Sequence, residues 1–184
     1  MTSHPSIPQG QAPPSWPLGA FQLRPMRSSD SAAWYAYLKD PRVVVHTSIP
    51  ELTLASVGDM VARELDGCAA GTSCRWALAD SDDRLVGTCG FSNWSLPHSH
   101  AELVYDLAPL FWGRGLMRGA VHQVLDWALG NVGFNRVHAF VMTTNVPSIR
   151  LLEAVGFLRE GTLRRFRIAR GVARDFHVYS VLRA

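Results

Sequence analysis

The spacing of apolar residues along the chain alternates between a period of two and a period of about 3.6, which separates predicted strands from predicted helices. Segments in which apolar and polar residues alternate, bounded by turn residues, predict strands at residues 21–24, 75–79, 85–92, 101–107, 136–141, 158–165 and 174–183. Helical spacing behind polar capping residues predicts helices at 31–39, 53–65, 115–132 and 145–155. The expected order, β α α β β β α β α β β, is typical of a mixed α/β domain.

The segment 101–141 is a strand–helix–strand unit that determines the expected topology. The apolar residues of its helix fall on one face: Met117, Val121, Val124, Leu125 and Ala128. Gly133 is placed to end this helix. Such a unit predicts a right-handed crossover between parallel strands. We therefore expect one mixed sheet with helices on both faces.

The N-terminal segment differs in composition from the rest. Residues 1–17 hold five of the eleven prolines, and no Asp, Glu, Lys or Arg precedes Arg24. This pattern predicts a flexible, Pro-rich tail over residues 1–19, followed by a single domain over residues 20–184. The tail contains two large apolar residues, Ile7 and Trp16, through which it would be able to dock onto the body or onto another subunit. The sequence leaves open whether it docks or stays loose.

Composition limits the classes of protein to consider. The chain has 184 residues, of which 47% are hydrophobic and 18% charged, which suits one globular domain. It contains neither a run of 18 apolar residues nor a signal-peptide pattern, so we expect a cytoplasmic protein without a membrane partner. A net charge of +3 is too small to indicate direct nucleic-acid binding. For the oligomeric state we expect a monomer or a homodimer.

Three cysteines are present, Cys68, Cys74 and Cys89, without CxxC spacing. An odd number in this arrangement favours buried free thiols over a disulfide framework or a zinc site.

The glycine-rich segment 112–118 joins a predicted strand to the longest predicted helix. Such a turn presents unpaired backbone N–H groups and the positive end of the helix dipole, which together bind phosphate or pyrophosphate. The segment fits neither a Walker loop nor a Rossmann fingerprint. By itself it is equally compatible with a tight structural turn.

Several motifs in the same order resemble the GNAT superfamily of acetyl-CoA-dependent N-acetyltransferases, and more closely its RimJ/RimL branch. They are "YDLAPLFWGRG", "NVGFNRVHAFV" and "TNVPSIRLLEAVGF" within residues 102–157, together with the opening "FQLRPMRSSDSAAW" and the closing "VYSVLR". The resemblance covers roughly residues 20–183. It implies a single-domain GNAT-like fold with a mostly antiparallel mixed sheet, in which one pair of parallel strands splays apart at the cofactor site.

The resemblance also implies acetyl-CoA as cosubstrate and no metal. The family's pyrophosphate loop aligns with residues 110–115, where Leu110 stands in place of Gln or Arg. Because backbone N–H groups hold the phosphates, this departure leaves the binding chemistry intact. The expected cofactor-binding residues are Leu107, Gly113, Arg114, Gly115, Leu116, Met117, Arg118 and Asn145, the last also suited to a helix N-cap.

Thioester aminolysis requires a base for a mostly protonated amine and a proton donor for the departing thiolate. Glu102 matches the family's general base, and Ser148 matches the hydroxyl near the sulfur. The structural alternatives are a surface carboxylate at the edge of a strand for Glu102 and a first-turn helix hydroxyl for Ser148. We expect both to be catalytic.

The acceptor pocket is expected to lie between the segments 43–49 and 93–100 and the Arg-rich hairpin. The hairpin has five arginines: Arg164, Arg165, Arg167, Arg170 and Arg174. A protein N-terminal α-amine is the expected acceptor, with a ribosomal protein as one candidate. A small-molecule amine acetyltransferase and a non-catalytic acyl-CoA sensor are the alternatives. His98 and His100 lack a third metal ligand, but would be able to reach the pocket.

Overall fold

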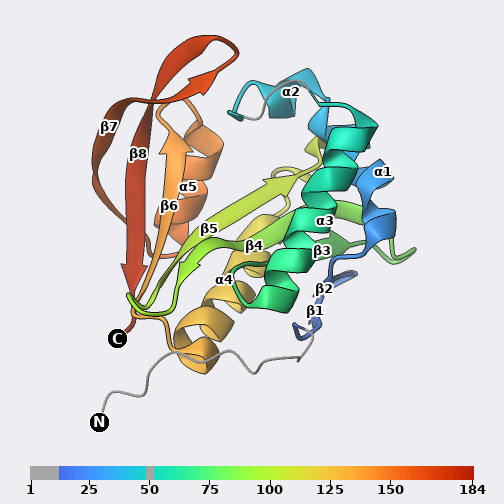
Figure 1. The fold of residues 1–184 in the computed structure, drawn as a ribbon, viewed down its shortest axis with the longest axis horizontal. Coiled ribbons are helices and arrows are strands. Elements are labelled where there is room, and N and C mark those ends of the chain that lie inside the picture. The colour runs from blue at the N-terminus through green and yellow to red at the C-terminus, as the bar shows by residue number, and fades with distance from the viewer. Residues whose placement is uncertain (1–12, 49–51) are drawn as a thin grey trace.

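The computed structural model describes residues 13–48 and 52–184, which form an eight-stranded sheet with helices on both faces (Figure 1). The strands are β1 Trp16–Leu18, β2 Phe21–Pro25, β3 Cys74–Ala79, β4 Leu85–Ser95, β5 His100–Leu107, β6 Arg136–Met142, β7 Leu158–Ala169 and β8 Val172–Leu182. The α-helices are α1 Ser31–Leu38, α2 Pro41–Val44, α3 Leu54–Ala70, α4 Leu116–Asp126 and α5 Val146–Ala154. Short 3₁₀ turns, η1 Ser28–Asp30 and η2 Pro109–Phe111, precede α1 and the glycine-rich turn.

The strand order is β1-β2-β3-β4-β5-β6-β8-β7, and only the central pair β5/β6 is parallel. That pair is short, because it joins His100 to Arg136, Ala101 to Val137 and Glu102 to His138. Beyond Glu102 and His138 the two strands no longer pair with each other, although β5 continues to Leu107 beside β4 and β6 continues to Met142 beside β8. The expected splayed parallel pair in a mostly antiparallel sheet is therefore confirmed.

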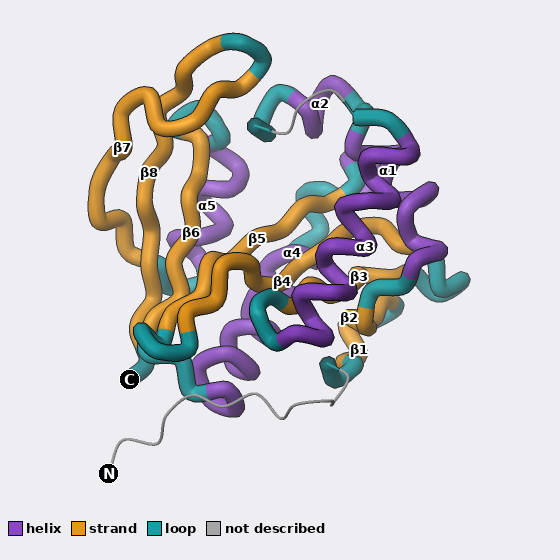
Figure 2. The backbone as a smooth tube through the Cα atoms, in the orientation of Figure 1, coloured by secondary structure: helices purple, strands orange, loops and turns teal. Residues whose placement is uncertain are grey.

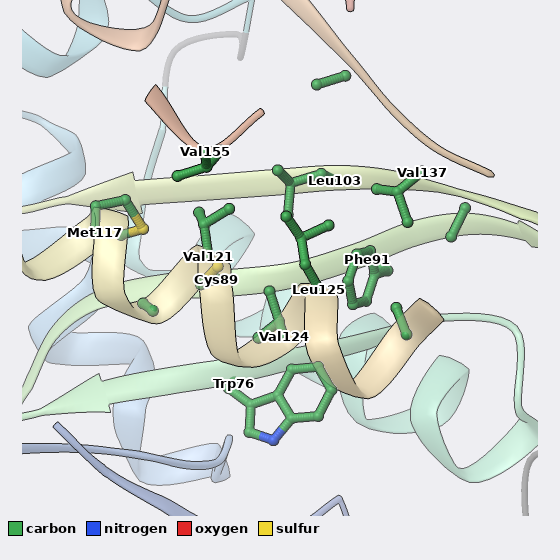
Figure 3. Packing of buried hydrophobic residues seen from close by; sticks show 14 of the residues in the cluster. Trp76, Cys89, Phe91, Leu103, Met117, Val121, Val124, Leu125, Val137 and Val155 are labelled. Atoms are coloured by element: carbon green, nitrogen blue, oxygen red, sulfur yellow. The ribbon is translucent and has the colours of Figure 1, made fainter. Parts of the chain in front are cut away.

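Alternation along the strands divides the core between the two faces of the sheet. In β3, Trp76 and Leu78 join the cluster that packs against α4, whereas Ala77 joins the cluster formed with α1 and α3. Figure 3 shows the α4 face, where Met117, Val121, Val124 and Leu125 lie against β4 and β5. The face of α4 that the helical spacing predicted to be buried is therefore buried.

Helix α4 continues into a π-helical turn, η3 Trp127–Val132, and ends at Gly133, which has a φ of +87°. Only a residue that tolerates this left-handed backbone ends the helix without strain. The expected helix over residues 115–132 and its glycine stop are confirmed.

Two elements were not expected from the sequence. Trp16–Leu18 form the edge strand β1 within the segment interpreted as a tail, and the indole of Trp16 packs 5.3 Å from that of Trp76. Ile7 lies outside the described residues. Asp40 and Pro41 do end α1 as expected, but they also begin the short helix α2, because the Asp40 carboxylate accepts a hydrogen bond from the backbone N–H of Arg42.

A buried ion pair ties the first strand of the core to the helix that follows it. Arg24 donates two hydrogen bonds, of 2.8 and 2.9 Å, to the carboxylate of Asp30, and both side chains are at most 5% exposed. Asp83, in the turn after β3, accepts a further hydrogen bond of 2.6 Å from the Arg24 Nε. Arg24 therefore holds β2, η1 and this turn together.

The three cysteines are free thiols, with Cys74 and Cys89 buried. The Sγ atoms of Cys68 and Cys74 lie 3.6 Å apart at the junction of α3 and β3. This hydrogen bond lowers the pKa of the Cys68 thiol to about 7, whereas burial raises the pKa of Cys89. Among the described residues, no helix is long and apolar enough to cross a membrane.

Candidate active site

Two clefts open where β5 and β6 diverge. The Glu102 cleft, of about 370 Å³, contains Glu102 and lies toward the β7–β8 hairpin. The glycine-turn cleft, of about 280 Å³, is lined by the turn that precedes α4. The two clefts share six lining residues: His46, Thr47, Tyr105, Asp106, Asn145 and Ser148. They therefore meet at the first turn of α5.

The glycine-rich turn has the backbone geometry of an anion site. Gly113 and Gly115 have φ values of +73° and +74°, and a Cβ added at either would meet no described atom within 4 Å. No side chain in the described chain caps the first turn of α4, whereas Thr53 caps α3 and Asn145 caps α5. The N–H groups of residues 116–118 thus have no partner within the helix, and the open turn exposes them together with the positive end of the helix dipole.

Of the eight expected cofactor-binding residues, seven line the glycine-turn cleft: Leu107, Gly113, Gly115, Leu116, Met117, Arg118 and Asn145. Arg114 is not among its lining residues, and its guanidinium lies 5.5 Å from the ring centre of Phe111. Trp112 also lines the cleft, and its indole donates a hydrogen bond of 2.7 Å to the carbonyl of Leu107. Arg42 of α2 also lines this cleft, which the sequence did not indicate.

Glu102 is the last residue of β5 that pairs with β6, and only 6% of its surface is exposed. The amide of Asn93 donates a hydrogen bond of 2.8 Å to one carboxylate oxygen, and Arg167 donates one of 3.3 Å to the other. Asn93 lies at a β-bulge of β4 with a φ of +50°, and the bulge changes the direction of its side chain. The carboxylate is therefore held by two polar partners at the wall of a cleft, unlike a free surface carboxylate.

Ser148 and Asn145 occupy the point at which the clefts meet. Asn145 accepts a hydrogen bond of 3.2 Å from the backbone N–H of Ser148, so it caps α5 as expected. The hydroxyl of Tyr105 donates a hydrogen bond of 3.5 Å to the carbonyl of Ser148, which links β5 to α5 across the splayed strands. Burial raises the pKa of Tyr105 above its ordinary value.

Asp106 anchors the far end of β5. Its carboxylate accepts hydrogen bonds from the indole of Trp34 at 3.2 Å, from Thr88 at 2.7 Å and from the hydroxyl of Tyr37. Arg75 lies 3.5 Å from the same carboxylate. Sequence reasoning missed this network because its members are far apart in the chain and share no motif.

Of the three segments expected to surround the acceptor, two contribute to the lining of the Glu102 cleft. His46, Thr47 and Ser48 line the Glu102 cleft from one side, and Arg167 lines it from the hairpin. The segment 93–100 is not part of this lining, although Asn93 contacts Glu102. His98 and His100 stack on each other with ring centres 6.4 Å apart, outside both clefts of the described chain.

Comparison with known proteins shows which family the chain matches. The acetyltransferase (GNAT) domain family matches residues 21–158. The uncharacterized N-acetyltransferase p20 of Bacillus licheniformis is 32% identical over 163 residues, which cover 88% of this chain and 92% of its own.

Two solved structures share the fold. The ribosomal-protein-S5-alanine acetyltransferase of Vibrio fischeri superposes with a TM-score of 0.82 at 21% identity, covering 93% of this chain and 97% of its own. The spermidine N-acetyltransferase of Vibrio cholerae, in complex with CoA and spermine, superposes with a TM-score of 0.79 at 18% identity, covering 90% of this chain and 97% of its own. With the family match over residues 21–158 and the p20 relative at 32% identity, the protein belongs to the GNAT acetyltransferases and is an acetyl-CoA-dependent N-acetyltransferase.

Proposed function

We propose that the protein acetylates the N-terminal α-amine of a protein or peptide, by direct attack of the amine on acetyl-CoA in a ternary complex. The observation that supports this most strongly is the meeting of the two clefts at Ser148 and Asn145. One cleft offers backbone donors for phosphates, and the other offers a carboxylate for an amine. A ternary complex needs this arrangement, because both substrates must reach one point.

Glu102 is the proposed general base. An α-amine has an ordinary pKa of ~8, so at neutral pH much of it is protonated and must lose a proton before it attacks. Glu102 takes this proton directly or through a water molecule. The hydrogen bond from Asn93 fixes the orientation of the carboxylate, so that the base is already positioned before the amine arrives.

The glycine turn and the start of α5 are proposed to hold acetyl-CoA. In this proposal the N–H groups of residues 116–118 bind the pyrophosphate, and Asn145, which lines the same cleft, binds the pantetheine arm between the splayed strands. Ser148 then donates its proton to the sulfur that leaves, and it is reprotonated by the proton that the attacking nitrogen releases as the amide forms. The bond that forms is the amide C–N bond, the bond that breaks is the thioester C–S bond, and the products are an acetylated amine and CoA.

The charges of the Glu102 cleft favour an α-amine over a polyamine. The cleft contains three carboxylates, and each lies beside an arginine: Glu64 and Asp106 are 3.4 and 3.5 Å from Arg75, and Glu102 is 3.3 Å from Arg167. Arg63 adds another cation to the lining. A second ammonium group of a polyamine would thus find no unpaired carboxylate among these three.

A panel assay tests the proposal. The enzyme is incubated with acetyl-CoA and with either N-terminal peptides, including those of ribosomal proteins, or small amines such as spermidine. Thiol release is followed, and mass spectrometry locates the acetyl group. We expect acetylation at the peptide α-amine. Turnover with small amines alone would contradict the proposal, and CoA binding without turnover on any amine would favour a sensor.

A further inference from the structure

The structure divides the five arginines of the β7–β8 hairpin into different roles. Only one of them, Arg167, lines the Glu102 cleft. Arg164 and Arg165 are exposed, and neither belongs to the lining of either cleft. Arg167 is therefore the hairpin arginine with direct access to this cleft.

Arg170 fixes the position of the hairpin tip. Its guanidinium donates hydrogen bonds to the carbonyls of Val45 at 2.8 Å and Thr47 at 3.2 Å, and to that of Val44. These carbonyls lie at the last residue of α2 and in the turn that follows it. Figures 1 and 2 show the hairpin tip curving toward α2 across the open end of the sheet. Arg170 thereby joins two walls of the cleft.

Arg167 lies on an aromatic platform. Its guanidinium carbon is 5.1 to 5.4 Å from the ring centres of Phe140, Phe166 and Phe176. Aromatic faces attract a cation, and this attraction is stronger where water is excluded. The platform therefore keeps the guanidinium in place even when its partner on the carboxylate side changes.

The contact of Arg167 with Glu102 is a loose one. A single nitrogen approaches one oxygen at 3.3 Å, and 36% of the Arg167 side chain remains exposed. The Arg24–Asp30 pair shows the contrast, because there two hydrogen bonds of 2.8 and 2.9 Å join side chains that are at most 5% exposed. A charge-assisted bidentate pair is shorter and stronger than a single long contact. A better carboxylate partner would therefore replace Glu102 readily.

We infer that Arg167 is a specificity-determining residue that binds a carboxylate in the first two residues of the acceptor. This inference rests on the proposed function. An amine placed at Glu102 brings the side chains of its own residue and of the next within reach of Arg167, because consecutive Cα atoms are only ~3.8 Å apart. When the acceptor carboxylate takes the guanidinium, Glu102 loses a competing cation and is free to take the proton of the amine.

Isosteric peptide pairs test this role without changing shape. Peptides with Asp or Asn at the first position, and with Asp or Asn at the second, have nearly the same shape, but only the Asp side chain carries a negative charge. At low salt we expect kcat/KM to be about tenfold higher for an Asp peptide than for its Asn partner, the size expected for one charge-assisted hydrogen bond. Because an exposed charge pair is screened at about 10 Å in 0.1 M salt, the preference should decrease with ionic strength.

Variants assign the preference to one side chain. Arg167→Gln should remove the Asp preference, Arg167→Lys should retain part of it, and Arg167→Glu should transfer it to peptides with Lys at the same position. Arg164→Gln, which removes an exposed charge from the same hairpin, is the matched control and should keep the wild-type ratio. The ratio of the two peptides separates recognition from a structural role, because a disordered site would lower both rates alike.

Two results would overturn the inference and leave the proposed function standing. One is equal kcat/KM for Asp and Asn peptides in the wild-type enzyme. The other is an Arg167→Gln variant that loses activity on both peptides and keeps their ratio. Turnover of small amines with no peptide acetylated would instead overturn the proposed function, and the inference with it.

Discussion

Gly115→Ala tests the cofactor site with a magnitude that follows from the backbone. Gly115 has a φ of +74°, and an added Cβ would meet no described atom within 4 Å, so the cost is conformational and not a clash. An L-residue in the left-handed region costs roughly 1–2 kcal/mol. For a chain of this size each kcal/mol lowers the Tm by roughly 2–4 °C, so calorimetry should show a decrease of about 2–8 °C.

The same Cβ enters the space where the pyrophosphate is proposed to approach the backbone. Loss of one or two charge-assisted hydrogen bonds should weaken CoA binding by about tenfold to a hundredfold in isothermal titration calorimetry at 25 °C. Gly171→Ala is the matched control, because Gly171 also has a φ of +74° and open space around its Cβ but lies at the hairpin tip. It should lose a similar stability and keep the CoA affinity. Unchanged CoA affinity in Gly115→Ala, or an equal loss in both variants, would refute the assignment of the site.

Three further experiments address the base, a thiol and the core. Glu102→Gln should lower kcat by roughly 10²-fold with little change in CoA affinity, and the deficit should shrink at high pH where the amine deprotonates unaided; wild-type rates at pH 7 would place the base elsewhere. The rate of Cys68 alkylation by iodoacetamide should rise with a midpoint near pH 7, since its pKa is lowered to about 7, while Cys74→Ala should move the midpoint upward and buried Cys89 should stay unmodified. Asp30→Asn should destabilise the fold by about 3 kcal/mol, because it leaves the buried Arg24 without its main partner, whereas Asp40→Asn in the exposed Asp40–Arg42 pair should scarcely change the Tm; similar Tm values for both variants would contradict this reasoning.

The local pattern of the sequence was sufficient for most of the elements. Helical spacing over residues 115–132 and the glycine that follows predicted α4, its buried face and its end, because periodicity and left-handed glycines act within a few residues. The strand–helix–strand unit over residues 101–141 also predicted the parallel pair β5/β6, at whose last paired position Glu102 lies. The edge strand β1 was missed, because its pairing with β2 and the packing of Trp16 on Trp76 involve partners that the local pattern does not reveal.

The sequence by itself determined which chemical groups are present and on which elements they lie: a glycine turn before a helix, a carboxylate on a strand, and a hydroxyl at a helix start. The tertiary structure decided which of these groups meet. The bulge in β4 directs Asn93 to Glu102, and of five similar arginines in one hairpin only Arg167, which is 65 positions from Glu102, reaches the carboxylate. The physical reason is that local spacing fixes the direction of a side chain relative to its own element, whereas contacts between distant elements depend on strand register, sheet twist and bulges.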